Sequence, residues 1–243
     1  MKPILLAGEI SRSADAGRGA YNGAARFVEL LAAEGVEVRQ LGAADCEAEF
    51  PRAPKDFDAY AAVVLSDVGA LPLLLTPAAK AGLPDVNRLD SLRRWVEGGG
   101  GLMMAGGYMS FQGAEGLARF HGTPVEDCLP VECRPHADGL EIPEGQAPTV
   151  CEPGHPALAD VPQPWPVVLG LNLVGLRPGS RLLARCDYRG ASYPLLAVRD
   201  YGKGRTLAWT TDIGPHWLSR PFLDWPGYRP LAANLIRWIA GEI

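Results

Sequence analysis

The first half of the chain alternates short, fully apolar runs with stretches whose apolar residues recur every three or four positions. A wholly apolar run is typical of a parallel strand covered on both faces, and the longer period is typical of an amphipathic helix. The pattern predicts strands at 4–7, 36–41, 60–65 and 101–105, a Ser- and Gly-rich loop at 11–19, and helices at 20–34 and 86–97. Strands and helices alternating at this spacing indicate a doubly wound α/β sheet.

Residues 121–166 interrupt this pattern with a concentration of prolines. We expect an irregular excursion there, with one or two short strands around 129–134. Further strands are predicted at 167–176, 181–186, 194–198 and 206–211, and a closing helix at 229–240. Because neither a repeat nor a low-complexity linker divides the chain, we expect a single domain over residues 1–243.

Composition narrows the classes of function. The net charge of −5 argues against a nucleic-acid or anionic-membrane partner, since both favour a basic face. No apolar run approaches the roughly 18 residues of a membrane helix, and no signal segment is recognisable, so we expect a cytoplasmic protein. The five cysteines are an odd number without a CxxC pair, which predicts neither a disulfide framework nor a metal site. We expect no cofactor.

Candidate site residues follow the predicted strands. In open α/β sheets the ligand crevice lies beyond the carboxyl ends of the strands. This rule, together with nearby polar groups, selects Glu9, Ser66, Asp67, Gly106, Gly107, Tyr108, Ser110, His121, Asp212, His216 and Trp217. Ser66 and Asp67 are equally well interpreted as caps of turns or helices. His121 and His155 lie in the irregular region, where loop roles are the alternative.

The turn after the strand at 101–105 resembles a nucleophile elbow, in which Ser or Cys occupies a strained turn between strand and helix. The elbow position falls on Gly106 or Gly107, and neither has a side chain that could attack a substrate. Glycine keeps the turn accessible, and its backbone N–H groups could hold an anion. The alternative is that these glycines only permit close packing.

Four strings in the sequence resemble a known family. They are GGGGLMMAGGYMSFQG, ARFHGTPVEDCLPV, HPAL and YGKGRTLAWTTDIGPHW, beginning at residues 98, 118, 155 and 201. They are similar to the glutamine amidotransferase-like family, a branch of the class I glutamine amidotransferase-like superfamily related to trehalose-utilisation-type proteins. The resemblance implies a flavodoxin-like three-layer α/β/α sandwich with a mostly parallel central sheet.

The family's catalytic pattern is not matched residue by residue. In the family that the chain resembles, a working class I amidotransferase has the motif G-x-C-x-G at the elbow and a His-x-Glu pair after a late strand. This chain has Gly106 and Gly107 at the elbow, and Asp212 followed by His216 after the late strand. Because thiolate attack on an amide needs both nucleophile and base, we expect no glutamine amidotransferase activity.

Two functions remain open. The first is a hydrolase-type activity on a small polar substrate, with Asp212 orienting His216 as general base and Glu9, Tyr108 and Ser110 nearby. The second is non-catalytic binding of a sugar-like molecule on an aromatic platform near the C-terminus. The platform would comprise Trp209, Trp217, Phe222, Trp225 and Tyr228. These aromatic residues could instead fill the core or an interface between subunits, as in an oligomeric structural protein, and we expect a homo-oligomer.

Overall fold

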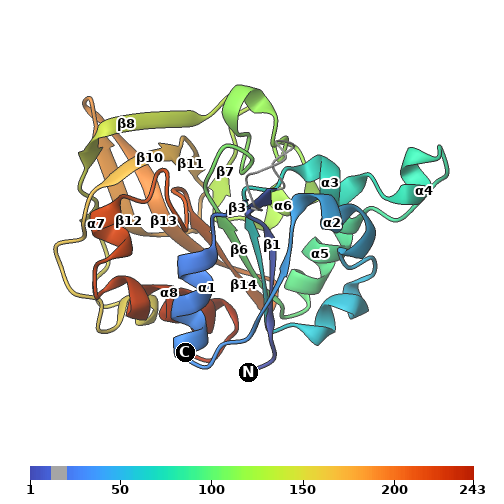
Figure 1. Ribbon diagram of the computed structural model, residues 1–243, viewed down its shortest axis with the longest axis horizontal. Helices are drawn as coiled ribbons and strands as arrows, with labels where there is room; N and C mark the ends of the chain where they lie inside the picture. The colour runs from blue at the N-terminus through green and yellow to red at the C-terminus, as the bar shows by residue number, and fades with distance from the viewer. Residues whose placement is uncertain (12–20) are drawn as a thin grey trace.

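A central eight-stranded sheet organises the protein, as the computed structural model shows (Figure 1). The structure describes residues 1–11 and 21–243, so the loop expected at 11–19 lies, except for Ser11, outside the described residues. The strand order is β4 (Val38–Leu41), β1 (Ile4–Gly8), β5 (Ala62–Ser66), β6 (Gly101–Ala105), β14 (Gly204–Trp209), β13 (Ala191–Tyr201), β12 (Arg181–Tyr188) and β9 (Thr149–Val150). The strands from β4 to β14 pair in parallel, and those from β14 to β9 pair antiparallel.

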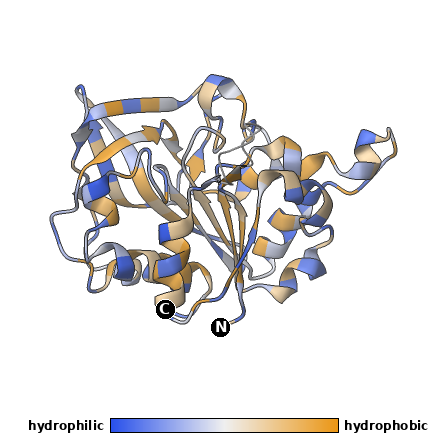
Figure 2. Cartoon of the chain, viewed as in Figure 1, coloured by the Kyte–Doolittle hydropathy of each residue, from blue (hydrophilic) through white to orange (hydrophobic). Residues whose placement is uncertain are grey.

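Helices cover both faces of the sheet. Along the fully buried β1, Ile4 and Leu6 face one core while Leu5 and Ala7 face the other, because successive strand side chains alternate. The first core is closed by α1 (Ala25–Ala33) and α8 (Tyr228–Ile239), and the second by α2 (Ala43–Glu49), α3 (Ala70–Leu74), α5 (Arg88–Glu97) and α6 (Pro124–Cys128). The central strands are mostly apolar, and the outer faces of the helices carry hydrophilic residues (Figure 2). The predicted three-layer sandwich is therefore confirmed.

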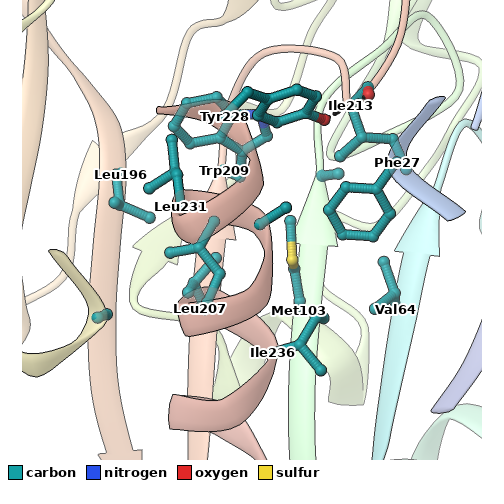
Figure 3. Packing of buried hydrophobic residues seen from close by; sticks show 14 of the residues in the cluster. Phe27, Val64, Met103, Leu196, Leu207, Trp209, Ile213, Tyr228, Leu231 and Ile236 are labelled. Atoms are coloured by element: carbon teal, nitrogen blue, oxygen red, sulfur yellow. Dashed lines mark hydrogen bonds between the residues drawn. The ribbon is translucent and has the colours of Figure 1, made fainter. Parts of the chain in front are cut away.

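The core beneath α8 fixes the segment that follows β14. Leu231 and Ile236 of α8 pack over β6 and β14 near Met103 and Leu207 (Figure 3). Burying each such aliphatic side chain stabilises the fold by about 1.5–3 kcal/mol. At the start of the helix, the Tyr228 hydroxyl donates a 2.6 Å hydrogen bond to the carbonyl of Ile213. This bond anchors the loop after β14 to the core.

The Pro-rich excursion is more ordered than its sequence indicates. The expected short strand is present as β7 (Val131–Glu132), paired with β11 (Gly175–Leu176). A longer strand, β8 (Gly139–Gln146), was not predicted, and it pairs antiparallel with β10 (Val168–Asn172) outside the main sheet. The remaining elements are β2 (Ile10–Ser11), β3 (Tyr21–Asn22), α4 (Pro77–Lys80), α7 (Arg220–Leu223) and the 3-10 turns Pro54–Ala59, Ala114–Gly116 and Pro156–Leu158.

Two expectations about the chain as a whole can be compared with the described residues. The five cysteines, at 46, 128, 133, 151 and 186, are all free thiols, as expected. Among residues 1–11 and 21–243, no helix has both the length and the apolar character needed to cross a bilayer.

Candidate functional site

A cavity of about 210 Å³ lies where β1, β5, β6 and β14 end. Its lining residues are Glu9, Tyr21, Asp67, Tyr108, Asp212, Pro215 and His216. Five of these seven are residues that the strand-end rule selected from the sequence. The rule missed Tyr21, which follows a loop rather than a buried strand, and Pro215, which has no polar side chain to draw attention.

The ends of β1 and β5 approach each other unusually closely. A Cβ on Gly8 would stand 1.7 Å from the carbonyl oxygen of Ser66, so only glycine fits there. The next residue of each strand then turns sharply, and Glu9 and Asp67 adopt left-handed backbone conformations with φ of 64° and 47°. Such conformations cost about 1–2 kcal/mol per residue outside glycine. Two strained carboxylic residues side by side are typical of a functional site.

Glu9 is a protonated acid in this environment. Burial of its carboxyl group, opposed by a 2.6 Å hydrogen bond from the Ser66 hydroxyl, raises the pKa of Glu9 to about 8. The negative charges of Asp67 and Asp212 add to the increase. Ser66 is fully buried and serves Glu9 rather than the cavity. At neutral pH, Glu9 therefore carries a proton that it can donate.

Asp67 joins the end of β5 to the loop after β6. Its Oδ1 accepts a 2.7 Å hydrogen bond from the backbone N–H of Met109, and its own N–H donates to the Ser110 hydroxyl oxygen at 3.0 Å. Burial raises the pKa of Asp67, while the bond from Met109 opposes that increase. Because the Ser110 side chain is buried and accepts this bond, Ser110 holds the loop and is not exposed to a substrate.

Gly107 occupies the elbow position and faces two carboxylates. A Cβ at this position would stand 2.9 Å from Oδ1 of Asp67 and 3.0 Å from Oδ1 of Asp212, and φ is 131°. Its N–H donates to Oδ1 of Asn172 at 3.0 Å. The N–H of Gly106 is likewise taken, by the carbonyls of Trp209 and Thr211. Neither glycine N–H is therefore free to hold an anion, contrary to one interpretation of the sequence.

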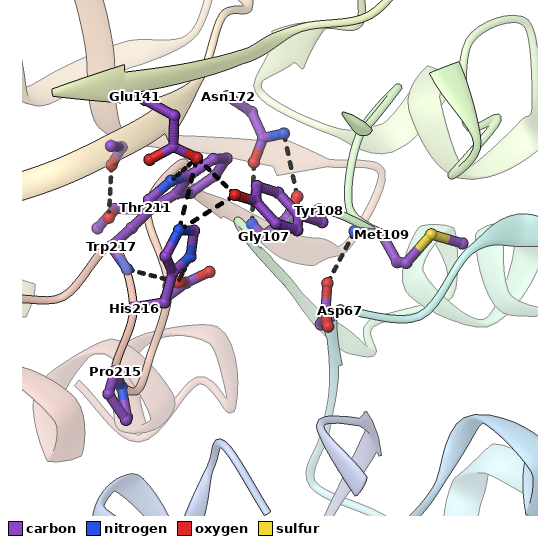
Figure 4. Close-up of polar contacts among 12 residues, drawn as sticks. Asp67, Gly107, Tyr108, Met109, Glu141, Asn172, Thr211, Pro215, His216 and Trp217 are labelled. Atoms are coloured by element: carbon purple, nitrogen blue, oxygen red, sulfur yellow. Dashed lines mark hydrogen bonds and ion pairs between the residues drawn. The ribbon is translucent and has the colours of Figure 1, made fainter. Parts of the chain in front are cut away.

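His216 lies between two carboxylates (Figure 4). Its Nδ1 is 3.4 Å from Oδ2 of Asp212, and its Nε2 is 3.5 Å from Oε1 of Glu141 and 3.3 Å from the Tyr108 hydroxyl. The hydrogen bond with Asp212 is the main cause that raises the pKa of His216 above 6.5. With a carboxylate at each ring nitrogen, His216 is stabilised as the imidazolium. It is therefore a weaker general base than its spacing from Asp212 suggested.

Glu141 is a further residue beside the cavity that the sequence did not reveal. It lies on β8, and its Oε1 accepts hydrogen bonds from the Tyr108 hydroxyl at 2.7 Å and from Nε1 of Trp217 at 3.0 Å. The bond to Glu141 is the main cause that raises the pKa of Tyr108 to about 12. Trp217 is itself fully buried, and its backbone N–H donates to Oδ2 of Asp212 at 2.8 Å. Trp217 thus orients Glu141 and Asp212 without lining the cavity.

The other candidate residues lie elsewhere. His121 is outside the cavity, with Nδ1 3.5 Å from Oε2 of Glu126 beside α6. His155 is buried against Trp238, and its Nδ1 accepts from the N–H of Ala157. The proposed aromatic platform is mostly core: Trp209, Trp217, Phe222 and Tyr228 are buried. Within the described part of the chain, no group of three or more His, Cys, Asp or Glu side chains is arranged to hold a metal ion.

The sandwich, with its turn after β6, defines an α/β protein of the class I glutamine amidotransferase-like type. The sequence model of the GATase1-like family, described as "Putative glutamine amidotransferase", matches residues 17–241. The chain belongs to this family, as the four strings indicated. No curated protein sequence gives a significant match.

Solved structures agree with this assignment. The cytoplasmic protein STM3548 from Salmonella typhimurium is 30% identical, with a TM-score of 0.88 over 98% of this chain and 99% of its own. The cytoplasmic protein STM1381 from Salmonella typhimurium LT2 is 28% identical, with a TM-score of 0.87 and the same coverage. A thuA-like protein from Parabacteroides merdae shares the fold at 15% identity and a TM-score of 0.58, over 99% of this chain and 90% of its own.

Proposed function

We propose that this protein is an acid–base hydrolase acting on a small, uncharged polar group, and that it is not a glutamine amidotransferase. The observation that carries the proposal is that three carboxyl groups, those of Glu9, Asp67 and Asp212, line one cavity, where burial raises the pKa of Glu9 to about 8 and so favours its neutral form. Carboxyl groups driven to different protonation states within one site are how a fold supplies both an acid and a base.

Each residue has a distinct role in this proposal. Glu9 donates its proton to the departing oxygen or nitrogen, while Asp212 removes a proton from the water whose oxygen bonds to the substrate carbon. His216, held 3.4 Å from Asp212, orients that carboxyl group. Among the described residues that line the cavity, Glu9, Asp67 and Asp212 carry carboxyl groups and only His216 is basic, so we expect an uncharged substrate rather than an anion.

The surroundings of Gly107 indicate that a cysteine at this position would not restore amidotransferase activity. A side chain there would meet the oxygens of Asp67 and Asp212 at 2.9 and 3.0 Å, with a backbone φ that side chains rarely adopt. Gly107→Cys should therefore destabilise the fold without producing glutaminase activity. Glutamine hydrolysis by a folded Gly107→Cys variant would contradict this view.

The test is a panel of chromogenic glycosides, esters and amides, together with glutamine, assayed from about pH 5 to about pH 9. We expect turnover of an uncharged substrate, falling above about pH 8 as Glu9 ionises. Asp212→Asn should lower the rate about a hundredfold or more, and the exposed Asp127→Asn should not change it. Turnover that is unaffected by Asp212→Asn would reject the proposal.

One observation favours a second candidate, binding of a small polar molecule without chemistry. Both nitrogens of His216 are already engaged by Asp212, Glu141 and Tyr108, as in a rigid recognition site. A ligand that raises the thermal midpoint of the wild type but is recovered unchanged would support this alternative. We also infer a cytoplasmic setting, because the two Salmonella structures carry that description, and a homo-oligomer, which light scattering tests.

A further inference from the structure

The cavity that holds Glu9 and Asp212 is called the catalytic cavity below. Two larger cavities follow it along the outer side of α1. Pro215 lines both the catalytic cavity and a second cavity of about 440 Å³. Arg26, Glu29 and Asp224 line both that second cavity and a third of about 420 Å³. In both cavities α1 forms one wall, and α7 with the start of α8 forms the wall opposite to it (Figure 1). We name the second and third cavities together the α1 groove.

The sizes of the cavities indicate an elongated ligand. The catalytic cavity, at about 210 Å³, is smaller than the roughly 300–1,000 Å³ that encloses a drug-sized molecule. It can hold one small unit, whereas each half of the α1 groove is about twice as large. A ligand made of linked units, with its end unit in the catalytic cavity and the following units in the α1 groove, would match this succession of cavities.

The charged side chains of the α1 groove are held in ion pairs. Arg26 pairs with Glu29 at 2.8 Å and Arg220 with Asp224 at 2.7 Å, and a third arginine, Arg229, pairs at 2.6 Å with Glu34, which does not line the groove. The groove therefore offers hydrogen-bond donors and acceptors side by side with little net charge. Such a surface suits a ligand whose groups both donate and accept, as hydroxyl groups do, more than it suits a phosphate or a cationic peptide.

An aromatic ring completes the far half of the α1 groove. Trp225 lines the third cavity and is only partly buried, unlike the other aromatic residues near it. Its ring packs against Phe222 at 5.4 Å and Trp165 at 6.4 Å between centroids, so it is held in a fixed orientation. A packed, partly exposed indole beside ion pairs presents an apolar face with polar groups at its edge.

We propose that the α1 groove binds a neutral oligosaccharide chain and presents its end to the catalytic cavity. The inference rests on the proposed function for the role of that end, but binding in the groove is independent of turnover. Sugar units supply hydroxyl groups for the ion pairs and an apolar ring face for Trp225. The ligand class thus becomes a polymer of uncharged sugars.

The experiment is a glycan array probed with the full chain, followed by calorimetry on a length series of the best neutral glycan. We expect a six-unit chain to bind at least about tenfold more tightly than a two-unit chain. Trp225→Ala and Arg26→Ala should remove most of this gain. Because Trp225 also packs against the core, Trp225→Phe provides a milder variant, and Arg94→Ala on the opposite face of the sheet is the control.

The outcomes separate the two proposals. Length-dependent binding without hydrolysis would reject the hydrolase and keep the α1 groove. Hydrolysis of small substrates with no dependence of affinity on length would reject the groove and keep the hydrolase. Failure to bind any neutral glycan, or preferential binding of acidic glycans or of an unstructured peptide, would overturn the inference.

Discussion

Glu9 couples the stability of the protein to pH. Its pKa rises from 4.5 to about 8 on folding, so between these values the native state holds a proton that the unfolded chain has lost. The free energy of unfolding must then fall as pH rises through this window. Each pKa unit corresponds to about 1.4 kcal/mol, which makes the effect a few kcal/mol. We expect Glu9→Gln, which keeps an acceptor for Ser66, to flatten this dependence in urea unfolding.

The exposed Glu132 on β7 offers the matched control. Glu132→Gln should leave the slope of stability against pH as it is in the wild type. An equally steep fall in the Glu9→Gln variant would show that another group titrates in this window.

His216 provides a second test at the residue scale. Its pKa is raised mainly by the hydrogen bond with Asp212, so Asp212→Asn should lower it. The stabilisation from this contact is fully present below pH 6.5 and is lost as pH rises through the raised value. NMR titration of the imidazole signals measures the change directly, with exposed His136 as an internal reference. An unchanged His216 titration would mean that Glu141, not Asp212, sets its charge.

At the scale of elements, one buried amide links the loop after β6 to β10 and the excursion. Asn172 donates to the carbonyl of Gly107 at 3.2 Å and to Oδ1 of Asp138 at 2.8 Å, and it accepts from the Gly107 N–H. Asp138 in turn accepts from the N–H groups of Gln112 and Gly113. These bonds hold a segment that has turns instead of the helix of a nucleophile elbow.

Removing that amide should loosen the loop. Asn172→Ala leaves the buried N–H of Gly107 without its partner, at a cost of about 1–3 kcal/mol, and removes one of three hydrogen bonds to the Asp138 carboxyl group. We expect lower stability in urea and faster amide hydrogen exchange across 107–113. Asn234→Ala removes an exposed bond to the carbonyl of Ala159 and is the control. Exchange at 107–113 that stays slow in Asn172→Ala would show that Asp67 and Asp138 order this loop without Asn172.

Whether a site residue could be predicted from the sequence depends on the kind of secondary-structure element that carries it. The strands at 4–7, 60–65 and 101–105 were predictable because burial on both faces requires an unbroken apolar run. The strand-end rule then located five of the seven cavity residues. It could not locate Glu141, because β8 contains Pro143 and Gly145, lies outside the main sheet and has only one buried residue among its eight. Pairing with β10, which is 20 or more residues distant, makes this segment a strand.

At the scale of the whole molecule, the site depends on parts that are far apart in the chain. The parallel half supplies Glu9 and Asp67, the loop beyond β14 supplies Asp212 and His216, and the Pro-rich excursion supplies Glu141. The β6–β14 pairing joins the two halves of the sheet within one continuous layer. A site assembled in this way requires that the halves fold together.

We therefore expect one cooperative unfolding transition. A single domain of 243 residues should absorb about 170 kcal/mol at its midpoint near roughly 60 °C, with equal calorimetric and van't Hoff enthalpies. Differential scanning calorimetry measures both enthalpies. Two separate units would instead give a van't Hoff enthalpy near half the calorimetric one, and Asn172→Ala would shift one of two transitions. A midpoint that rises with protein concentration would add support for the homo-oligomer, because association stabilises the native state by mass action.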